Sequence, residues 1–233
     1  MKTGLMLCAT AVLASGANAG IELEFLAQGA GTQVSVDFFG DSRDTFVGQL
    51  IHEVDGFTGG LSGLNGQQIS FCPDLPEDVA TEPTHYELVD LTDVPVTADM
   101  SSTPLTSAQA DAVLRIVSAA PEVFDASFTG NGRSAAFQLV LWEIIYDFDG
   151  TAASLDLESG NVSFTRTDGT SVFSGALGSS ATDLLDAAIN GDINQGVIAL
   201  ANAGNQDQLF LPTPGGTVVL AAAGLAVARR RRG

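Results

Sequence analysis

The chain has 233 residues, of which 45% are hydrophobic and 16% are charged, and its 28 acidic residues outnumber nine basic ones. The apolar fraction argues for a packed core rather than a disordered polymer. The net charge of −19 repels phosphate backbones, which argues against nucleic acid as a partner.

The first 19 residues have the pattern of a secretory signal peptide. Lys2 precedes an apolar run from Leu5 to Leu13, and Ala17-Asn18-Ala19 forms a small-residue cleavage site. Cys8 lies within this segment, so the predicted exported region, residues 20–211, contains a single cysteine, Cys72. A lone thiol in an oxidising compartment cannot form an internal disulfide, so it is buried, pairs with another molecule or engages in another covalent bond.

The first half of the exported region is predicted to be an antiparallel sheet. Apolar and polar residues alternate over 21–25, 34–38 and 45–54, which indicates half-buried strands, and 68–72 and 86–91 are further candidates. The predicted turns lie at glycines, namely Gly29, Gly31, Gly40, Gly56, Gly59 and Gly60.

The second half is predicted to be mainly helical. A proline-rich loop over 73–84 precedes a helix that starts at Thr106 or Ser107 and stops before Pro121. A second helix, over about 134–148, is apolar almost all round and should be central and buried. Residues 161–174 indicate a hairpin, and 181–202 a helix with an interruption near 190–192. The predicted fold is α+β and β-rich, a single antiparallel sandwich-like or barrel-like domain with packed helices.

Residues 212–233 resemble a sorting and membrane-anchor segment. Pro212-Thr213-Pro214 is followed by two glycines, an uncharged stretch from Thr217 to Ala228, and four arginines, Arg229, Arg230, Arg231 and Arg232. The stretch is short for a helix that crosses a bilayer. The arginine cluster should stay cytoplasmic and leave the preceding chain outside.

Two short segments in the middle of the chain could carry chemistry. Phe71-Cys72-Pro73-Asp74-Leu75 follows a predicted strand, and Gln138 and Trp142 lie one turn apart on the predicted apolar helix. Burying an amide without a partner costs about 1–3 kcal/mol, so Gln138 needs a compensating interaction. Two alternatives remain open: the amide hydrogen-bonds the backbone of a neighbouring strand, or the Cys72 sulfur displaces ammonia from it to form a thioester that Trp142 shields from water.

These segments resemble two groups of exported proteins. FCPDL followed by AAFQLVLWEI is similar to the internal thioester domain of bacterial surface adhesins, over about residues 45–150. With the tail, the pair also resembles exported proteins that carry a PEP-CTERM sorting signal, although this chain has Pro212-Thr213-Pro214 where that family usually has Pro-Glu-Pro.

The resemblance implies a Cys72–Gln138 thioester shielded by Trp142, with Asp74 as an acidic neighbour without an assigned role. It also implies a β-rich fold, processing by an exosortase-like membrane protease, and a place in a Gram-negative cell envelope. The implied function is covalent attachment to an amine-bearing surface or matrix partner, without turnover or a cofactor.

Two other functions stay open on the residues. One is a passive structural or extracellular-matrix protein with the same sorting, and the other is a secreted hydrolase that uses Cys72 and His85. Neither His85 nor His52 lies in a nucleophile motif. The acidic segments 147–150 and 190–194 begin like calcium loops but lack the remaining ligands.

Overall fold

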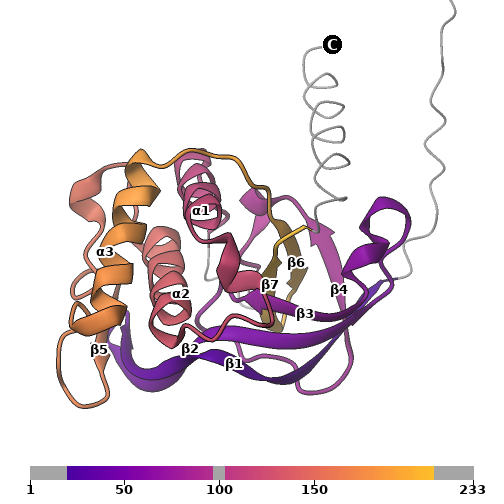
Figure 1. Ribbon diagram of the computed structural model, residues 1–233, viewed down its shortest axis with the longest axis horizontal. Coiled ribbons are helices and arrows are strands. Elements are labelled where there is room, and N and C mark those ends of the chain that lie inside the picture. The colour runs from indigo at the N-terminus through magenta and orange to yellow at the C-terminus, as the bar shows by residue number, and fades with distance from the viewer. Residues whose placement is uncertain (1–19, 97–102, 213–233) are drawn as a thin grey trace, which may run out of the picture.

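The computed structural model describes residues 20–96 and 103–212, which form one antiparallel sheet with helices on one side (Figure 1). The strands are β1 (Ile21–Phe38), β2 (Asp41–Asp55), β3 (Gly66–Phe71), β4 (Thr84–Val89), β5 (Val162–Arg166), β6 (Ile198–Asn202) and β7 (Asn205–Phe210); the α-helices are α1 (Ser107–Ala119), α2 (Asn131–Tyr146) and α3 (Gly175–Asn190). The predicted α+β, β-rich class is therefore confirmed.

The predicted terminal signals fall almost entirely outside this part of the chain. Residues 1–19 and 213–233, including Thr213, Pro214 and Arg229–Arg232, lie outside the described residues, whereas Pro212 is buried at the end of them. Among the described residues, every helix is too short or too polar to span a bilayer.

The strands follow the order β2-β3-β7-β6-β4-β1-β5, and β1 also pairs with β2 along most of its length. This extra pairing connects β2, the first strand in this order, with β1, the sixth. A closed cycle of hydrogen-bonded strands results, in the order β1, β2, β3, β7, β6 and β4. The smaller apolar cluster draws its residues mainly from these strands, including Leu23, Tyr86 and Phe210. β5 pairs with the second half of β1 outside the cycle.

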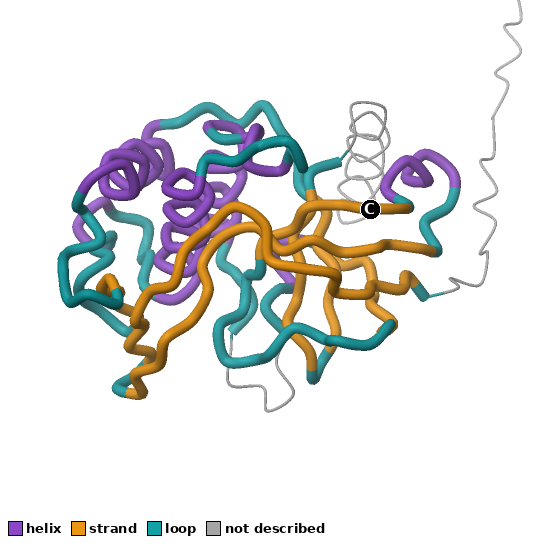
Figure 2. The backbone as a smooth tube through the Cα atoms, turned by 60° about the horizontal axis from the view of Figure 1, so that its bottom comes forward, coloured by secondary structure: helices purple, strands orange, loops and turns teal. Residues whose placement is uncertain are grey.

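The helices lie against one side of the strands, with α2 between α3 and α1 (Figures 1 and 2). The larger apolar cluster includes residues of the strands and of all three helices, and α2 contributes many of them. Every residue of α2 from Ser134 to Ile145 is buried, because the helix contacts α1, α3, β1 and β2. This confirms the expectation of a central helix that is apolar on all sides. The predicted start of α1 is also correct, since Thr106 and Gln109 form a reciprocal capping box.

Gly29 and Gly31 are not turns, contrary to prediction. They lie within β1, which continues past them with two register irregularities against β2. A Cβ added at Gly31 would lie 2.4 Å from the Val47 carbonyl oxygen, and one at Gly48 would lie 2.3 Å from that of Ala30. These glycines therefore allow two bulged strands to approach closely, which is the other common reason for glycine inside a strand.

The prediction of helix through residue 202 is also wrong. α3 ends at Asn190, and residues 198–202 form β6, which is followed by β7. Residues 198–201 are all buried, because β6 lies between β4 and β7 and both of its faces are covered. Such a strand lacks the alternation that would distinguish it from a short buried helix. In the predicted hairpin, the return strand is reduced to one bridge between Thr165 and Ser171.

The close approach of β1 to β2 at Gly48 should not tolerate a side chain at that position. Gly48 has a φ of +146° and faces Ala30 and Gly31, so Gly48→Ala combines backbone strain with overpacking. We expect a loss of at least about 2 kcal/mol in the free energy of unfolding, measured by urea denaturation. Gly196→Ala is the control, because a Cβ there meets nothing within 4 Å. Equal urea midpoints for the two variants would contradict the conclusion that β1 and β2 leave no room for a side chain at Gly48.

Candidate functional site

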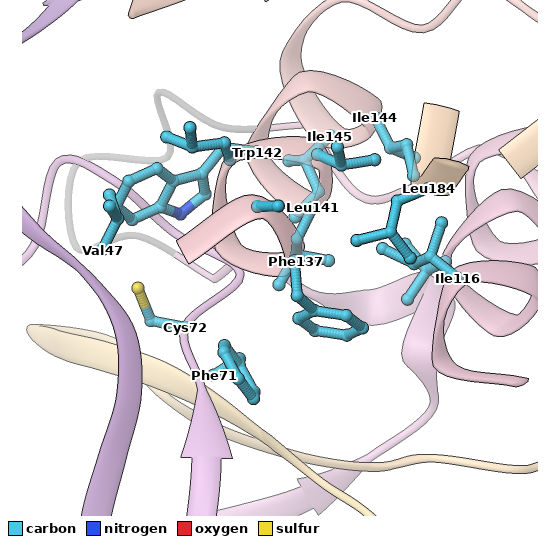
Figure 3. Packing of buried hydrophobic residues seen from close by; sticks show 14 of the residues in the cluster. Val47, Phe71, Cys72, Ile116, Phe137, Leu141, Trp142, Ile144, Ile145 and Leu184 are labelled. Carbon is cyan, nitrogen blue, oxygen red and sulfur yellow. The ribbon is translucent and has the colours of Figure 1, made fainter. Parts of the chain in front are cut away.

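Cys72 is the first residue after β3, at the point where the strand leaves the sheet. β3 pairs with β2 and β7, so the position of Cys72 is fixed from both sides. Its thiol is free and buried. Figure 3 shows the sulfur directed toward Trp142 and Val47, away from the ring of Phe71.

The structure brings Gln138 directly against Cys72. The Gln138 Nε2 donates to the Cys72 carbonyl oxygen at 2.8 Å, and the Cys72 backbone N–H donates to Gln138 Oε1 at 3.2 Å. Both residues are buried. The predicted partners, 66 positions apart in the sequence, therefore share one buried contact, and the hydrogen bonds expected of an unreacted glutamine are present.

Further hydrogen bonds hold the segment after Cys72. The backbone N–H of Leu75 donates to Tyr146 Oη at 2.9 Å, and the Arg43 guanidinium donates to the Leu75 carbonyl oxygen. The Asp207 backbone N–H donates to Asp74 Oδ2 at 2.6 Å. Asp74, whose role the sequence left unassigned, therefore ties the cysteine segment to β7.

Trp142 covers the Cys72–Gln138 contact. It lies one helical turn after Gln138, its side chain is only 1% exposed, and its indole stacks on Phe164 at a centroid distance of 6.2 Å. Figure 3 shows the nitrogen side of the indole facing the Cys72 sulfur. The Trp142 Nε1 has no hydrogen-bond partner within the described part of the chain.

A cavity of about 280 Å³ connects this contact to the surface. Cys72, Gln138 and Trp142 line its buried part, and exposed Asp44 and Asp78 belong to its outer lining. A small molecule or the end of a long side chain could therefore approach the sulfur and the carboxamide without unfolding the domain.

Burial dominates the electrostatics of the site. Desolvation raises the pKa of the Cys72 thiol well above its ordinary value, the nearby Asp74 raises it further, and the Trp142 side chain and Arg43 lower it. Desolvation likewise raises the pKa of the Asp74 carboxyl well above its usual range and that of Asp207 to about 7. The free sulfur is therefore held as a neutral thiol, without the depressed pKa of an activated cysteine nucleophile.

Neither histidine lines the cavity at Cys72. His85 lies on β4, where its exposed side chain places Nε2 4.0 Å from Glu22 Oε2. His52 is buried on β2, where its Nδ1 lies 3.0 Å from Ser70 Oγ, and burial lowers its pKa to about 4. The arrangement offers no histidine base next to the thiol.

The acidic segments noted for calcium are engaged in local structure. The Asp147 carboxylate accepts from the backbone N–H groups of Asn161 and Val162, and that of Asp149 accepts from Thr151. In residues 190–194, the Asn190 side chain donates to Asp186. Within the described ranges, no group of three or more His, Cys, Asp or Glu residues is arranged to hold a metal ion.

Comparison with protein-family models, with curated proteins and with solved structures found no match to this chain. The residues of the site therefore carry the functional argument by themselves.

Three residues that hold the site were not singled out from the sequence. Tyr146 follows Gln138 and Trp142 at the same four-residue spacing, so helical periodicity could have found it. Arg43 is one of only four arginines between residues 20 and 211. Asp207 carries no local signal, because its contact with Asp74 depends on how β7 pairs with β3.

Glu143, next to Trp142, is a fully buried carboxyl group with one unpartnered oxygen. Its Oε1 accepts from the Asp156 N–H at 2.6 Å, whereas Oε2 has no partner among the described residues. Burial raises the pKa of Glu143 to about 8, with Asp147 and Asp156 adding to the rise and the Asp156 hydrogen bond opposing it. The fold therefore favours the protonated acid at this position.

Glu143→Gln should flatten the pH dependence of stability. A carboxyl whose pKa is raised by folding contributes stability that is fully present below the unfolded pKa, about 4.5, and is lost as the pH rises through about 8. We expect the variant to gain stability relative to the wild type between about pH 5 and about pH 9, on the order of a few kcal/mol. Chemical denaturation across that range measures the difference. The opposite contribution of His52 is common to both proteins and cancels. A difference that stays constant with pH would contradict the predicted protonation of Glu143.

Proposed function

We propose that this protein is an exported cell-envelope or surface protein, sorted by a PEP-CTERM-like tail and an exosortase-like protease, whose Cys72 and Gln138 form an internal thioester. The thioester attaches the domain covalently to an amine-bearing surface or matrix partner. The observation that carries this proposal is the pair of hydrogen bonds between the Gln138 carboxamide and the backbone of Cys72, which places the two residues side by side in a buried site that a cavity connects to the surface.

The contact suits thioester formation. The Cys72 sulfur attacks Cδ of Gln138, the Cδ–Nε2 bond breaks, and the thiol proton leaves with the nitrogen as ammonia. The Cys72 N–H already donates to Gln138 Oε1, the atom that takes up negative charge as the sulfur adds. A preorganised donor of this kind stabilises the intermediate of an acyl transfer. Because both residues are buried, solvent reaches the product only through the cavity.

The surroundings also suit an amine partner. Asp44 and Asp78 in the outer lining of the cavity attract a protonated amine. Residues 20–211 contain all 28 acidic residues and no lysine, so their negative charge attracts an amine at longer range as well. The same lack of lysine removes competing side-chain amines from the domain itself.

A passive structural or matrix protein is the second candidate, and one observation favours it. Both hydrogen-bonding groups of the Gln138 amide are satisfied by the backbone of Cys72, which is all that a buried structural glutamine needs. In that case the pair joins α2 to the end of β3 and has no chemistry.

The intact mass of the purified mature protein separates the two candidates. We expect the wild type to be lighter by one ammonia than its sequence requires, and to regain mass as a methylamine adduct with release of one thiol. Cys72→Ala and Gln138→Ala should show the full mass and no adduct. The wild type at full mass, with a titratable thiol and no adduct, would refute the thioester.

Gln28→Ala is the matched control for this experiment. Gln28 also lines the cavity but is exposed, so its removal should leave both the mass deficit and the adduct unchanged. If Gln28→Ala abolished the deficit as completely as Gln138→Ala, the assignment of the acyl group to Gln138 would be wrong.

A further inference from the structure

The Trp142 indole is positioned for more than excluding water. Its N–H is a buried donor without a hydrogen-bond partner in the described part of the chain, and burying such a group unpaired destabilises a folded protein. A phenylalanine or leucine would cover the contact equally well without that cost. The unpaired donor therefore calls for an explanation that a shield does not supply.

The direction of the N–H suggests what it serves. Figure 3 shows the indole nitrogen on the side of the ring that faces the Cys72 sulfur, and the indole and the sulfur line the same cavity. The stack on Phe164 fixes the ring plane at an angle of 19° to the phenyl ring. The indole is therefore held near the sulfur without a full hydrogen bond to the neutral thiol, which is a weak acceptor.

The sulfur needs such a donor when it carries charge. In the attachment reaction, an amine nitrogen attacks Gln138 Cδ, a C–N bond forms, the Cδ–Sγ bond breaks and its electron pair goes to sulfur. The proton lost by the nitrogen ends on the Cys72 thiol. Burial strongly disfavours the intervening thiolate, as the raised pKa of Cys72 indicates, and the Trp142 side chain acts against burial by lowering that pKa.

We propose that the Trp142 indole N–H stabilises the Cys72 sulfur by a hydrogen bond that strengthens as the sulfur becomes negatively charged, both when the thioester forms and when an amine opens it. This inference rests on the proposed thioester for its role in the reaction, but the contact between the N–H and the sulfur can be tested in the free thiol alone.

Trp142→Phe tests the proposal because it keeps an aromatic cover and removes the N–H. A hydrogen bond to a charged group contributes about 1.5–3 kcal/mol, so thiol release by methylamine should slow by about 10- to 100-fold, as followed by time-resolved intact mass. If Trp142 were only a shield, opening would be as fast as in the wild type or faster, and either result would overturn the proposal. Gln28→Ala is the matched control, since Gln28 also lines the cavity but is exposed, and its removal leaves the indole and its stack on Phe164 in place.

A second measurement is independent of the thioester. In the Gln138→Ala background the thiol is free, and its alkylation by iodoacetamide at a fixed pH reports the thiolate fraction. Adding Trp142→Phe should lower that rate by about tenfold or more, whereas adding Gln28→Ala should not. An unchanged rate in the Trp142→Phe protein would overturn the contact, whereas a full-mass wild type would refute only the proposed function.

A third measurement leaves Trp142 intact, in case its replacement prevents folding. The chain contains one tryptophan, so its indole N–H gives a single resonance in the spectrum of the nitrogen-labelled protein. In the Gln138→Ala background, adding Cys72→Ala should shift this resonance upfield and speed its exchange with solvent. The same shift and exchange rate in both proteins would contradict the contact.

Discussion

The fold brings together two buried groups that each need a partner, the Gln138 carboxamide in the middle of α2 and the backbone of Cys72 at the end of β3. Their two hydrogen bonds satisfy an amide that would otherwise destabilise α2, which is buried from Ser134 to Ile145. They also fix the rotation of α2 against the sheet. Because Trp142 and Tyr146 follow Gln138 at intervals of one turn, that rotation directs the indole toward the sulfur and the phenol toward the Leu75 N–H.

The sheet positions Cys72 and the segment that follows it. β3 ends at Phe71 between β2 and β7, so the chain must leave the sheet at Cys72, where its backbone N–H and carbonyl are free of strand pairing. Asp207, on β7, then holds Asp74, and Arg43, on β2, reaches the Leu75 carbonyl. The strands that flank β3 therefore also position the segment after it. The close approach of β1 and β2 at Gly31 and Gly48 allows β2 to take part in both pairings.

The parts of this arrangement that the sequence predicts are the local ones. The capping pair of α1, the apolar surround of α2 and the strand before Cys72 follow from patterns within a few residues. The contact between Cys72 and Gln138 was expected only from a resemblance and from the need of a buried amide for a partner. The predictions that were wrong concern residues whose role depends on distant parts of the chain. β6 is covered on both faces, so its sequence lacks the alternation of polar and apolar residues that indicates a strand. Gly31 allows a close approach of two strands and does not form a turn. The tie between Asp74 and Asp207 depends on the pairing of β3 with β7, which no local pattern encodes.

The proposed thioester places opposing demands on its surroundings, and different parts of the site bear on each. Resistance to hydrolysis requires that little water reaches Cys72 and Gln138, and their burial against α2 and the indole of Trp142 limits its access. Reaction with an amine requires access, and the cavity supplies it past acidic side chains that attract cations. Dryness alone would also trap the sulfur, because a thiolate without a donor is a poor leaving group in an apolar site. A single indole, with a broad apolar face and one N–H at its edge, can exclude water and stabilise the departing sulfur, which neither phenylalanine nor a small polar residue could do alone.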